Sequence, residues 1–154
     1  MTYRITGIDP APYRHLFGLS DEELAEHGVF RMTVTDPTFP CRVSLTDRAI
    51  GETVLLLNHV SHDVANPYRA SHAIFVTEAI DGAAEYVDEV PPVFVPRVLS
   101  LRGFDKHGMM AEAILTQPGE ADAGIRKLFA NPEIETIHAH NATRGCFAAK
   151  ITRN

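Results

Sequence analysis

A segment near the C-terminus, IHAHNATRGCFAAKI, concentrates polar residues of the types that enzymes use for chemistry. The candidates are His138, His140, Asn141, Arg144 and Cys146. An imidazole can transfer a proton, a thiolate is a nucleophile, and a guanidinium binds carboxylate or phosphate. The segment therefore predicts a reactive site, and its geometry depends on the local fold.

The segment has the pattern of a β-hairpin, with strands ETIHAHN and CFAAKIT joined by a turn at ATRG. Alternation places His138 and His140 on one face of the first strand and Ile137 on the other. If the face of the second strand that carries Phe147 pairs with the Ile137 face, Cys146 projects from the same side as the histidines. The alternation alone leaves this register open.

Cys146 is the predicted nucleophile of this hairpin. The cationic side chain of Arg144 would stabilise its thiolate, and His138 or His140 would serve as the general base. Asn141 would orient one of these histidines or contact the substrate. The alternative is that Cys146 is a small, unreactive core residue, as most cysteines in cytosolic proteins are.

The two histidines could also bind a divalent metal ion. Side chains two residues apart on a strand lie on the same face, and imidazole suits zinc, iron, copper or nickel. Two ligands do not make a site, so another cysteine, histidine or carboxylate would have to complete it. The alternative is a polar strand face with hydrogen-bonded histidines. No other cofactor is indicated, since the chain has no P-loop, dinucleotide fingerprint or Cys-x-x-Cys motif.

Arginines in predicted strands could bind an anionic small molecule. Arg42 lies in CRVSL, Arg69 lies two residues before Ser71 in PYRASHAIF, and Arg102 lies in SLRGFD. A hydroxyl group beside a guanidinium is a common arrangement for holding a carboxylate or phosphate. The alternative is that each arginine forms an ion pair with one of the 20 acidic residues.

The composition limits the classes of partner. The 154 residues fit a single domain spanning residues 1–154, with enough hydrophobic residues for a core without metal or disulfide support. A formal net charge of -6 and the lack of a basic stretch argue against nucleic-acid binding. No apolar run is long enough to cross a membrane, and no secretory signal is evident. With two cysteines and no disulfide framework, we expect a cytoplasmic protein.

The elements that must position these residues are short helices and many strands. Capping and stop signals predict helices in IDPAPYRHLFG, LSDEELAEHG and GEADAGIRKLFANP. Ser20 and Glu23 have the spacing of a capping box, and Ala121, Ile125, Leu128 and Phe129 form one apolar stripe. Strands are predicted in VFRMTVT, CRVSL, ETVLLLNHV, SHAIFVTEA, RVLSLRGF and MMAEAIL, and in the terminal hairpin. Few strands are separated by a crossover helix, which disfavours a parallel sheet. The predicted class is α+β, with a curved or barrel-like, mainly antiparallel sheet and two or three short helices.

Several motifs in combination resemble a known family. FPCRVSL, GETVLLLNH, PYRASHAIFV, SLRGFDKHGMM and IHAHNATRGCFAAK are similar to the bacterial family catalogued as domain of unknown function 1203. The resemblance covers nearly the whole chain and implies a single-domain bacterial protein. It implies no activity and no catalytic residues.

The residues therefore support three hypotheses. The first is a small enzyme that acts on an anionic small molecule through a pocket of arginine, histidine and cysteine side chains. The second is a noncatalytic anion-binding or sensing module, in which a homodimer is one arrangement. In the third, the terminal hairpin is an interface element. The first hypothesis requires the arginines and the histidine pair to line one concave pocket, and it is dropped if His138 and His140 lie far from Arg42 and Arg69. An ordinary thiol at Cys146 would count against nucleophilic catalysis and favour the second.

Overall fold

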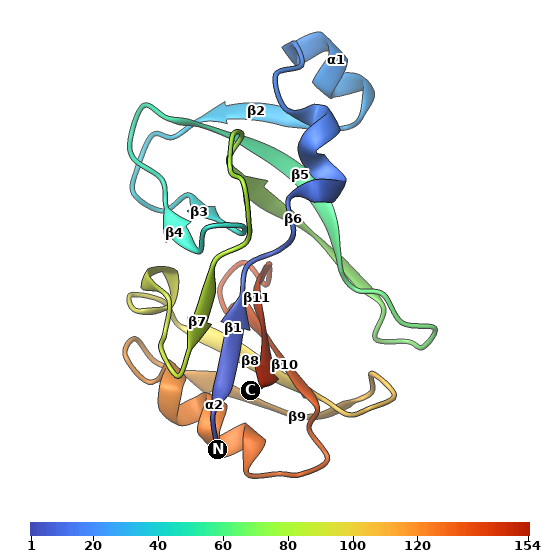
Figure 1. Cartoon of the computed structure of the whole chain (residues 1–154), viewed down its shortest axis with the longest axis vertical. Helices are drawn as coiled ribbons and strands as arrows, with labels where there is room; N and C mark the ends of the chain where they lie inside the picture. Colours follow the sequence, from blue (N-terminus) through green and yellow to red (C-terminus); the bar gives the residue numbers. More distant parts are fainter.

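A computed structural model describes residues 1–154, and its strands form two β-sheets (Figure 1). Sheet A has six strands and every neighbouring pair is antiparallel. Its spatial order is β7 (Glu85–Val87), β1 (Tyr3–Thr6), β11 (Phe147–Arg153), β10 (Thr136–Asn141), β8 (Leu99–Phe104) and β9 (Met110–Thr116). The chain termini lie side by side at this sheet, where the backbone N–H of Asn154 donates to the carbonyl of Thr2.

Sheet B has five strands and is mixed. Its spatial order is β2 (Phe30–Thr33), β5 (Thr53–His62), β6 (Ala70–Val76), β3 (Pro40–Cys41) and β4 (Thr46–Asp47). The contact between β3 and β6 is parallel, and the other pairs are antiparallel. The long β5–β6 hairpin extends from this sheet toward sheet A (Figure 1).

Two α-helices and two 3₁₀ helices accompany the sheets. They are η1 (Ala11–Leu16), α1 (Asp21–Glu26), η2 (Pro92–Phe94) and α2 (Ala121–Phe129). The Ser20 hydroxyl accepts from the backbone N–H of Glu23, whose carboxylate accepts from the N–H of Ser20, so the predicted capping box is confirmed. Helix α2 buries Ile125 and Leu128 and packs on β8 and β9.

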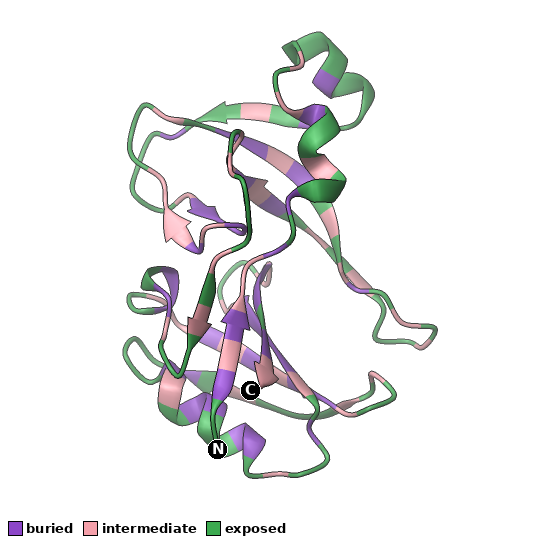
Figure 2. Ribbon diagram, in the orientation of Figure 1, coloured by how far each residue is buried: buried purple, intermediate pink, exposed green.

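Each sheet has its own hydrophobic cluster, and the two clusters interlock. Sheet A packs the larger cluster, which includes Tyr3, Ile125 and Ile137, and sheet B packs the smaller one. Phe147 of sheet A belongs to the cluster of sheet B, and Leu45, which follows β3, belongs to the cluster of sheet A. Figure 2 shows buried residues gathered along the strands of both sheets, with exposed ones on α1 and the loops.

The predicted α+β class is confirmed, with mainly antiparallel strands and few short helices. Neither sheet closes into a barrel, because each ends in open edge strands. The strand predicted in CRVSL is wrong beyond its first residue. Strand β3 ends at Cys41, and Leu45 adopts a left-handed conformation (φ 55°) in a turn that leads back into β4. None of the helices has the length and hydrophobicity needed to cross a bilayer.

Candidate functional site

The β10–β11 hairpin contains a β-bulge that separates the two groups of candidate residues. Ala139 pairs with Ala149, but His140 then pairs with Phe147, so one extra residue is accommodated in β11. The bulge places Phe147, rather than Cys146, on the face of the histidines. The predicted pairing of faces therefore forms at Ile137 and Ala139, which lie opposite Ile151 and Ala149, but the bulge ends it before Cys146.

His138 and His140 belong to a group of five imidazoles between the sheets, three of them buried and two half-buried, which we call the inter-sheet histidine cluster. Its members are His59 and His62 of β5, His72 of β6, and His138 and His140 of β10. The rings of His138 and His62 lie 5.0 Å apart between centroids, and those of His140 and His72 lie 4.9 Å apart. Phe147 contacts His59, His138 and His140 in the same layer.

Burial makes His138 and His140 weak bases. Desolvation, and secondarily the charge of His62, lowers the pKa of His138 to about 3. Desolvation also lowers the pKa of His140 to about 4, although the hydrogen bond from its Nδ1 to the carbonyl of Gly145 (2.9 Å) opposes the shift. Both rings are therefore neutral at physiological pH. Their predicted roles as catalytic bases stay predictions.

The predicted divalent metal has no complete ligand set in this cluster. No group of three or more His, Cys, Asp or Glu side chains in the chain is arranged to hold a metal ion. One nitrogen of His140 donates to the carbonyl of Gly145, and one of His62 donates to that of Gly108. Through these hydrogen bonds and the aromatic contacts, the histidines form a packed layer that joins the two sheets.

Cys146 lies at the other end of the hairpin turn and lines a cavity of about 710 Å³. The cavity is formed by the segment before β3, the segment after η2 and the β10–β11 turn. Its lining residues are Asp36, Pro37, Thr38, Phe39, Pro40, Arg42, Asp47, Phe75, Pro96, Arg97, Val98, Asn141, Ala142, Thr143, Arg144 and Cys146. Four of the residues predicted from the sequence, Arg42, Asn141, Arg144 and Cys146, are thus brought together.

Two N–H donors contact the sulfur of Cys146. Arg42 donates from Nη2 at 3.2 Å, and Asn141 donates from Nδ2 at 3.3 Å. The same guanidinium is held by two backbone carbonyls, with Nε donating to Phe147 (2.6 Å) and Nη1 donating to Pro40 (2.7 Å). These hydrogen bonds fix the orientation of Arg42 against the thiol.

Arg42 is a buried cation without a carboxylate partner. Its exposed fraction is 3%, and it takes part in no salt bridge. Burial lowers the pKa of the guanidinium, and the neighbouring Cys146 opposes that shift. An uncompensated buried charge is costly unless hydrogen bonds or a counter-ion stabilise it. The cavity is therefore electrostatically suited to an anion at this position.

The other charged residues of the cavity differ in their pairing. Arg97 forms a bidentate pair with Asp47, with Nη–Oδ distances of 2.6 and 2.9 Å. Arg144 is exposed and forms no ion pair. The buried Oδ1 of Asn141 has no hydrogen-bond partner. Asp36 also lines the cavity, where its carboxylate accepts from the backbone N–H of Thr38 and forms no ion pair. The lining thus carries three cations and two carboxylates, and Arg42 and Arg144 are its cations without an ion-pair partner.

The remaining predicted anion-binding residues lie elsewhere. Arg69 is exposed and pairs with Asp63 (2.9 Å), and Ser71 lies nearby on β6. Arg102 lies on β8 opposite His138, and its Nε donates to Ser100 (3.4 Å). None of the three lines the cavity of Cys146, so their roles in binding stay predictions.

Two features of the cavity were not predicted from the sequence: the pair of Arg97 and Asp47, and the stacked rings of Phe39 and Phe75, whose centroids are 4.8 Å apart. All four residues line the cavity. Pro37 and Pro40 flank Phe39, and Pro96 precedes Arg97, and such prolines mark irregular segments, where binding residues often lie. The pairing itself has no sequence signal, because 50 positions separate Asp47 from Arg97.

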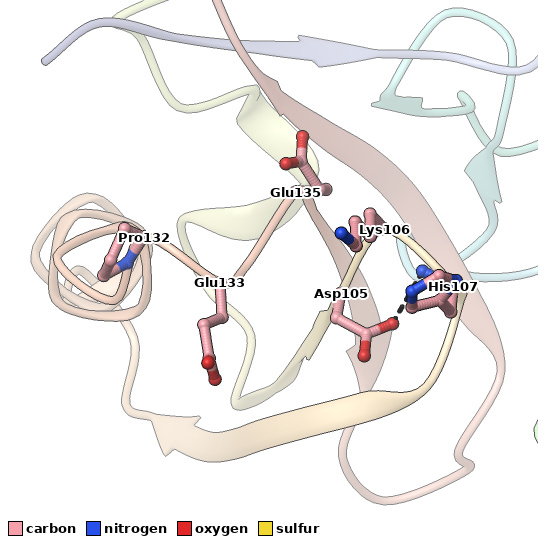
Figure 3. Close-up of a pocket in the computed structure, with 6 residues that line it drawn as sticks. All are labelled: Asp105, Lys106, His107, Pro132, Glu133 and Glu135. Carbon is pink, nitrogen blue, oxygen red and sulfur yellow. Dashed lines mark hydrogen bonds between the residues drawn. The ribbon is translucent and has the colours of Figure 1, made fainter.

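A second, smaller hollow of about 340 Å³ lies beside the β8–β9 turn (Figure 3). Five polar or charged residues and one proline line it: Asp105, Lys106, His107, Pro132, Glu133 and Glu135. Asp105 accepts from the backbone N–H groups of His107 and Met109, which stabilises the turn and lowers the pKa of its carboxyl. Figure 3 shows that Glu135 points away from Glu133 and Asp105, so the carboxylates do not converge.

Comparison with known proteins shows a family but no characterised relative. Residues 38–153 match the profile of a family described as a protein of unknown function (DUF1203). This range includes Arg42, Asp47, Arg97 and the whole β10–β11 hairpin. No curated protein and no solved structure matches the chain.

Proposed function

We propose that this chain, which belongs to the DUF1203 family of unknown function, is a small enzyme that binds an anionic small molecule beside the thiol of Cys146. The observation that carries the proposal is the contact between Cys146 and Arg42, a buried guanidinium that has no carboxylate partner. A bound anion would supply the missing counter-charge and would lie next to a nucleophile.

Arg42 is suited to bind both the thiolate and the substrate. Two backbone carbonyls hold its orientation, and each Nη nitrogen carries two N–H groups. One N–H of Nη2 contacts the sulfur, which leaves further donors for a carboxylate or phosphate. Arg144, exposed at the same cavity, would attract the anion from solvent.

Cys146 would act as a nucleophile that is activated by hydrogen-bond donors. Its sulfur contacts Arg42 and Asn141, and neither residue is a base at neutral pH. Donors aimed at sulfur stabilise the thiolate, which is the reactive form. In this proposal the histidines support the hairpin, and Asn141 positions the sulfur.

A noncatalytic anion-binding or sensing module is the second candidate. It is favoured by one observation, namely that no general base is hydrogen-bonded to Cys146. The same cations would then hold an anion without a reaction. The two candidates differ in what replacing Cys146 by Ser does: it abolishes the activity of an enzyme but leaves anion binding by a module intact.

Alkylation with reagents of different charge tests the proposed site. The ratio of the rates with anionic iodoacetate and neutral iodoacetamide should be about tenfold higher for Cys146 than for an unstructured cysteine peptide. Inorganic phosphate should protect Cys146 more strongly against iodoacetate than against iodoacetamide. Peptide mapping by mass spectrometry assigns the modified residue, and the Cys41→Ala variant serves as the control with an unchanged ratio.

The opposite result is equally clear. A rate ratio equal to that of the unstructured peptide, with no protection by phosphate, would show that the cavity does not attract anions. The proposed function would then be abandoned for both the enzyme and the binding module.

A further inference from the structure

The surroundings of Cys146 restrict the type of reaction that its thiolate can perform. Acyl transfer usually needs a general acid to protonate the leaving group, but the two groups that contact the sulfur are a guanidinium and an amide. A disulfide needs no such acid, because its leaving group is a thiolate that is stable near neutral pH. The geometry therefore favours thiol–disulfide exchange over acyl transfer.

Asn141 indicates a further property of the substrate. Its Nδ2 donates to the sulfur of Cys146, which leaves the buried Oδ1 as an acceptor without a partner. A buried unpaired acceptor is costly, and a ligand that brings an N–H group beside the sulfur would satisfy it. An amide next to the reacting disulfide, as in a cysteine-containing peptide, has such a group.

The size and walls of the cavity agree with a peptide-sized ligand. Its volume of about 710 Å³ is within the usual range for small-molecule sites and is far larger than a peroxide needs. The stacked rings of Phe39 and Phe75 supply an apolar wall. Arg42 and Arg144 are the cations of the lining that form no ion pair, and they would bind carboxylates at the part of the cavity beside Cys146.

The second cysteine of the chain is not placed to take part. Cys41 is fully buried, lies outside the cavity lining, and its sulfur accepts from the backbone N–H of Thr77 at 3.4 Å. An internal disulfide with Cys146 is therefore not part of the reaction. A second small thiol must complete the cycle.

Building on the proposed function, we infer that the substrate is the disulfide of a small acidic peptide thiol. The Cys146 thiolate attacks one sulfur of the substrate, a protein–peptide disulfide forms, the substrate S–S bond breaks, and a peptide thiolate leaves. A second peptide thiolate then attacks the peptide sulfur of the mixed disulfide. This step releases a new peptide disulfide and restores the Cys146 thiolate. The small thiol is oxidised and the original disulfide is reduced, so electrons balance.

Reaction of the reduced full chain with two disulfides tests the inference. Oxidised glutathione is an acidic peptide disulfide, and cystamine is a cationic disulfide without carboxylates. We expect the chain to gain one glutathione at Cys146, about tenfold faster than an unstructured cysteine peptide does. Relative to that peptide, cystamine should show no acceleration. Reduced glutathione should then remove the adduct, as followed by intact mass.

Two variants assign the effect to the cavity. Arg144→Ala should slow the reaction with oxidised glutathione about threefold and leave the reaction with cystamine unchanged or faster. Cys41→Ala should react like the natural chain. Arg42→Lys keeps the charge and loses the planar fork, so it should slow adduct formation, with circular dichroism confirming that it folds.

The outcomes separate the inference from the proposed function. A raised iodoacetate ratio at Cys146, with oxidised glutathione no faster than cystamine, overturns the acidic peptide disulfide and leaves the anion site standing. If Cys146 prefers neither iodoacetate nor oxidised glutathione, both the inference and the proposed function are overturned. An adduct on Cys41 instead of Cys146 also overturns the inference.

Discussion

His138 and Cys146 lie on the same hairpin, but their environments are opposite. His138 is packed among the rings of His62, Phe104 and Phe147 in the inter-sheet histidine cluster. Cys146 lines a cavity of about 710 Å³ and contacts the cationic group of Arg42. A single bulge in β11 directs one group of polar residues to the interior and the other to the cavity.

Two kinds of basic side chain, imidazole and guanidinium, respond differently to burial. An imidazole can lose its proton, and burial lowers the pKa of His138 to about 3 and that of His140 to about 4, so these two histidines are uncharged. A guanidinium cannot be deprotonated in a protein. Arg42 instead stays charged and is stabilised by two backbone carbonyls and by the sulfur of Cys146. A buried arginine without an acidic partner is therefore the stronger indication of an anion site.

Replacing Phe147 by Ala should give the largest effect and should disrupt only one of the two regions. The phenyl ring contacts three histidines, so its removal leaves a cavity that costs about 3–5 kcal/mol of unfolding free energy. Arg42 contacts the backbone carbonyl of Phe147, which the substitution retains. Urea denaturation should show the loss, while the iodoacetate ratio at Cys146 stays within about twofold.

Phe30→Ala is the matched control, because the Phe30 side chain is 59% exposed on the edge strand β2. It should change the free energy of unfolding by less than about 0.5 kcal/mol. A large change in the iodoacetate ratio of a folded Phe147→Ala variant would show that the two regions are coupled.

Acidification should destabilise the histidine cluster. The folded-state pKa values of His138 and His140, about 3 and about 4, lie below the ordinary value of 6.5, so the unfolded chain binds more protons between these limits. The stabilising contribution is present above pH 6.5 and is lost as the pH falls. Each histidine should contribute a slope of up to about 1.4 kcal/mol per pH unit in the free energy of unfolding.

Denaturation of a His138→Asn variant at several pH values from about 4 to about 7 checks this assignment. In this range the unfolded chain binds more protons than the folded chain. The variant should have a flatter pH dependence than the natural chain. His107→Asn, in the exposed β8–β9 turn, should leave the slope unchanged. Equal slopes in all three proteins would contradict the buried, neutral state of His138.

Asp47→Asn should leave Arg97 as a third cation of the cavity without an ion-pair partner. It breaks the bidentate pair with Arg97, and we expect a loss of about 1 kcal/mol in unfolding free energy. The freed guanidinium should raise the iodoacetate ratio at Cys146 about twofold. Glu52→Gln breaks the pair of Arg48 and Glu52 outside the cavity and should leave that ratio unchanged.

Local signals in the sequence predicted much of the fold. The capping box of Ser20 and Glu23 and the apolar stripe of α2 depend on residues within one or two turns, and both were predicted. Strand β1, with four residues, was not predicted because its pattern is too short to distinguish from a loop. The turn after Cys41 was mistaken for a strand, since its apolar residues are buried by tertiary packing.

The candidate site was only partly predictable for the same reason. The types of residue at Arg42 and Cys146 indicated anion binding and nucleophilic chemistry, but 104 positions separate the two residues that are in contact. The bulge in β11 has no strong local signal, and it decides which side chain joins the histidines. Long-range contacts and one extra residue in a strand thus account for what the sequence did not show.

Arg144→Ala should have the smallest effect on stability and should act only on the cavity. Its side chain is exposed and unpaired, so the free energy of unfolding should change by less than about 0.5 kcal/mol. The iodoacetate ratio at Cys146 should fall about threefold, and Arg144→Glu should lower it further because the sign of the charge is reversed. Arg69→Ala, which removes an exposed arginine paired with Asp63 outside the cavity, is the control. If Arg69→Ala lowers the ratio as much as Arg144→Ala does, general surface charge, and not the cavity, attracts the anion.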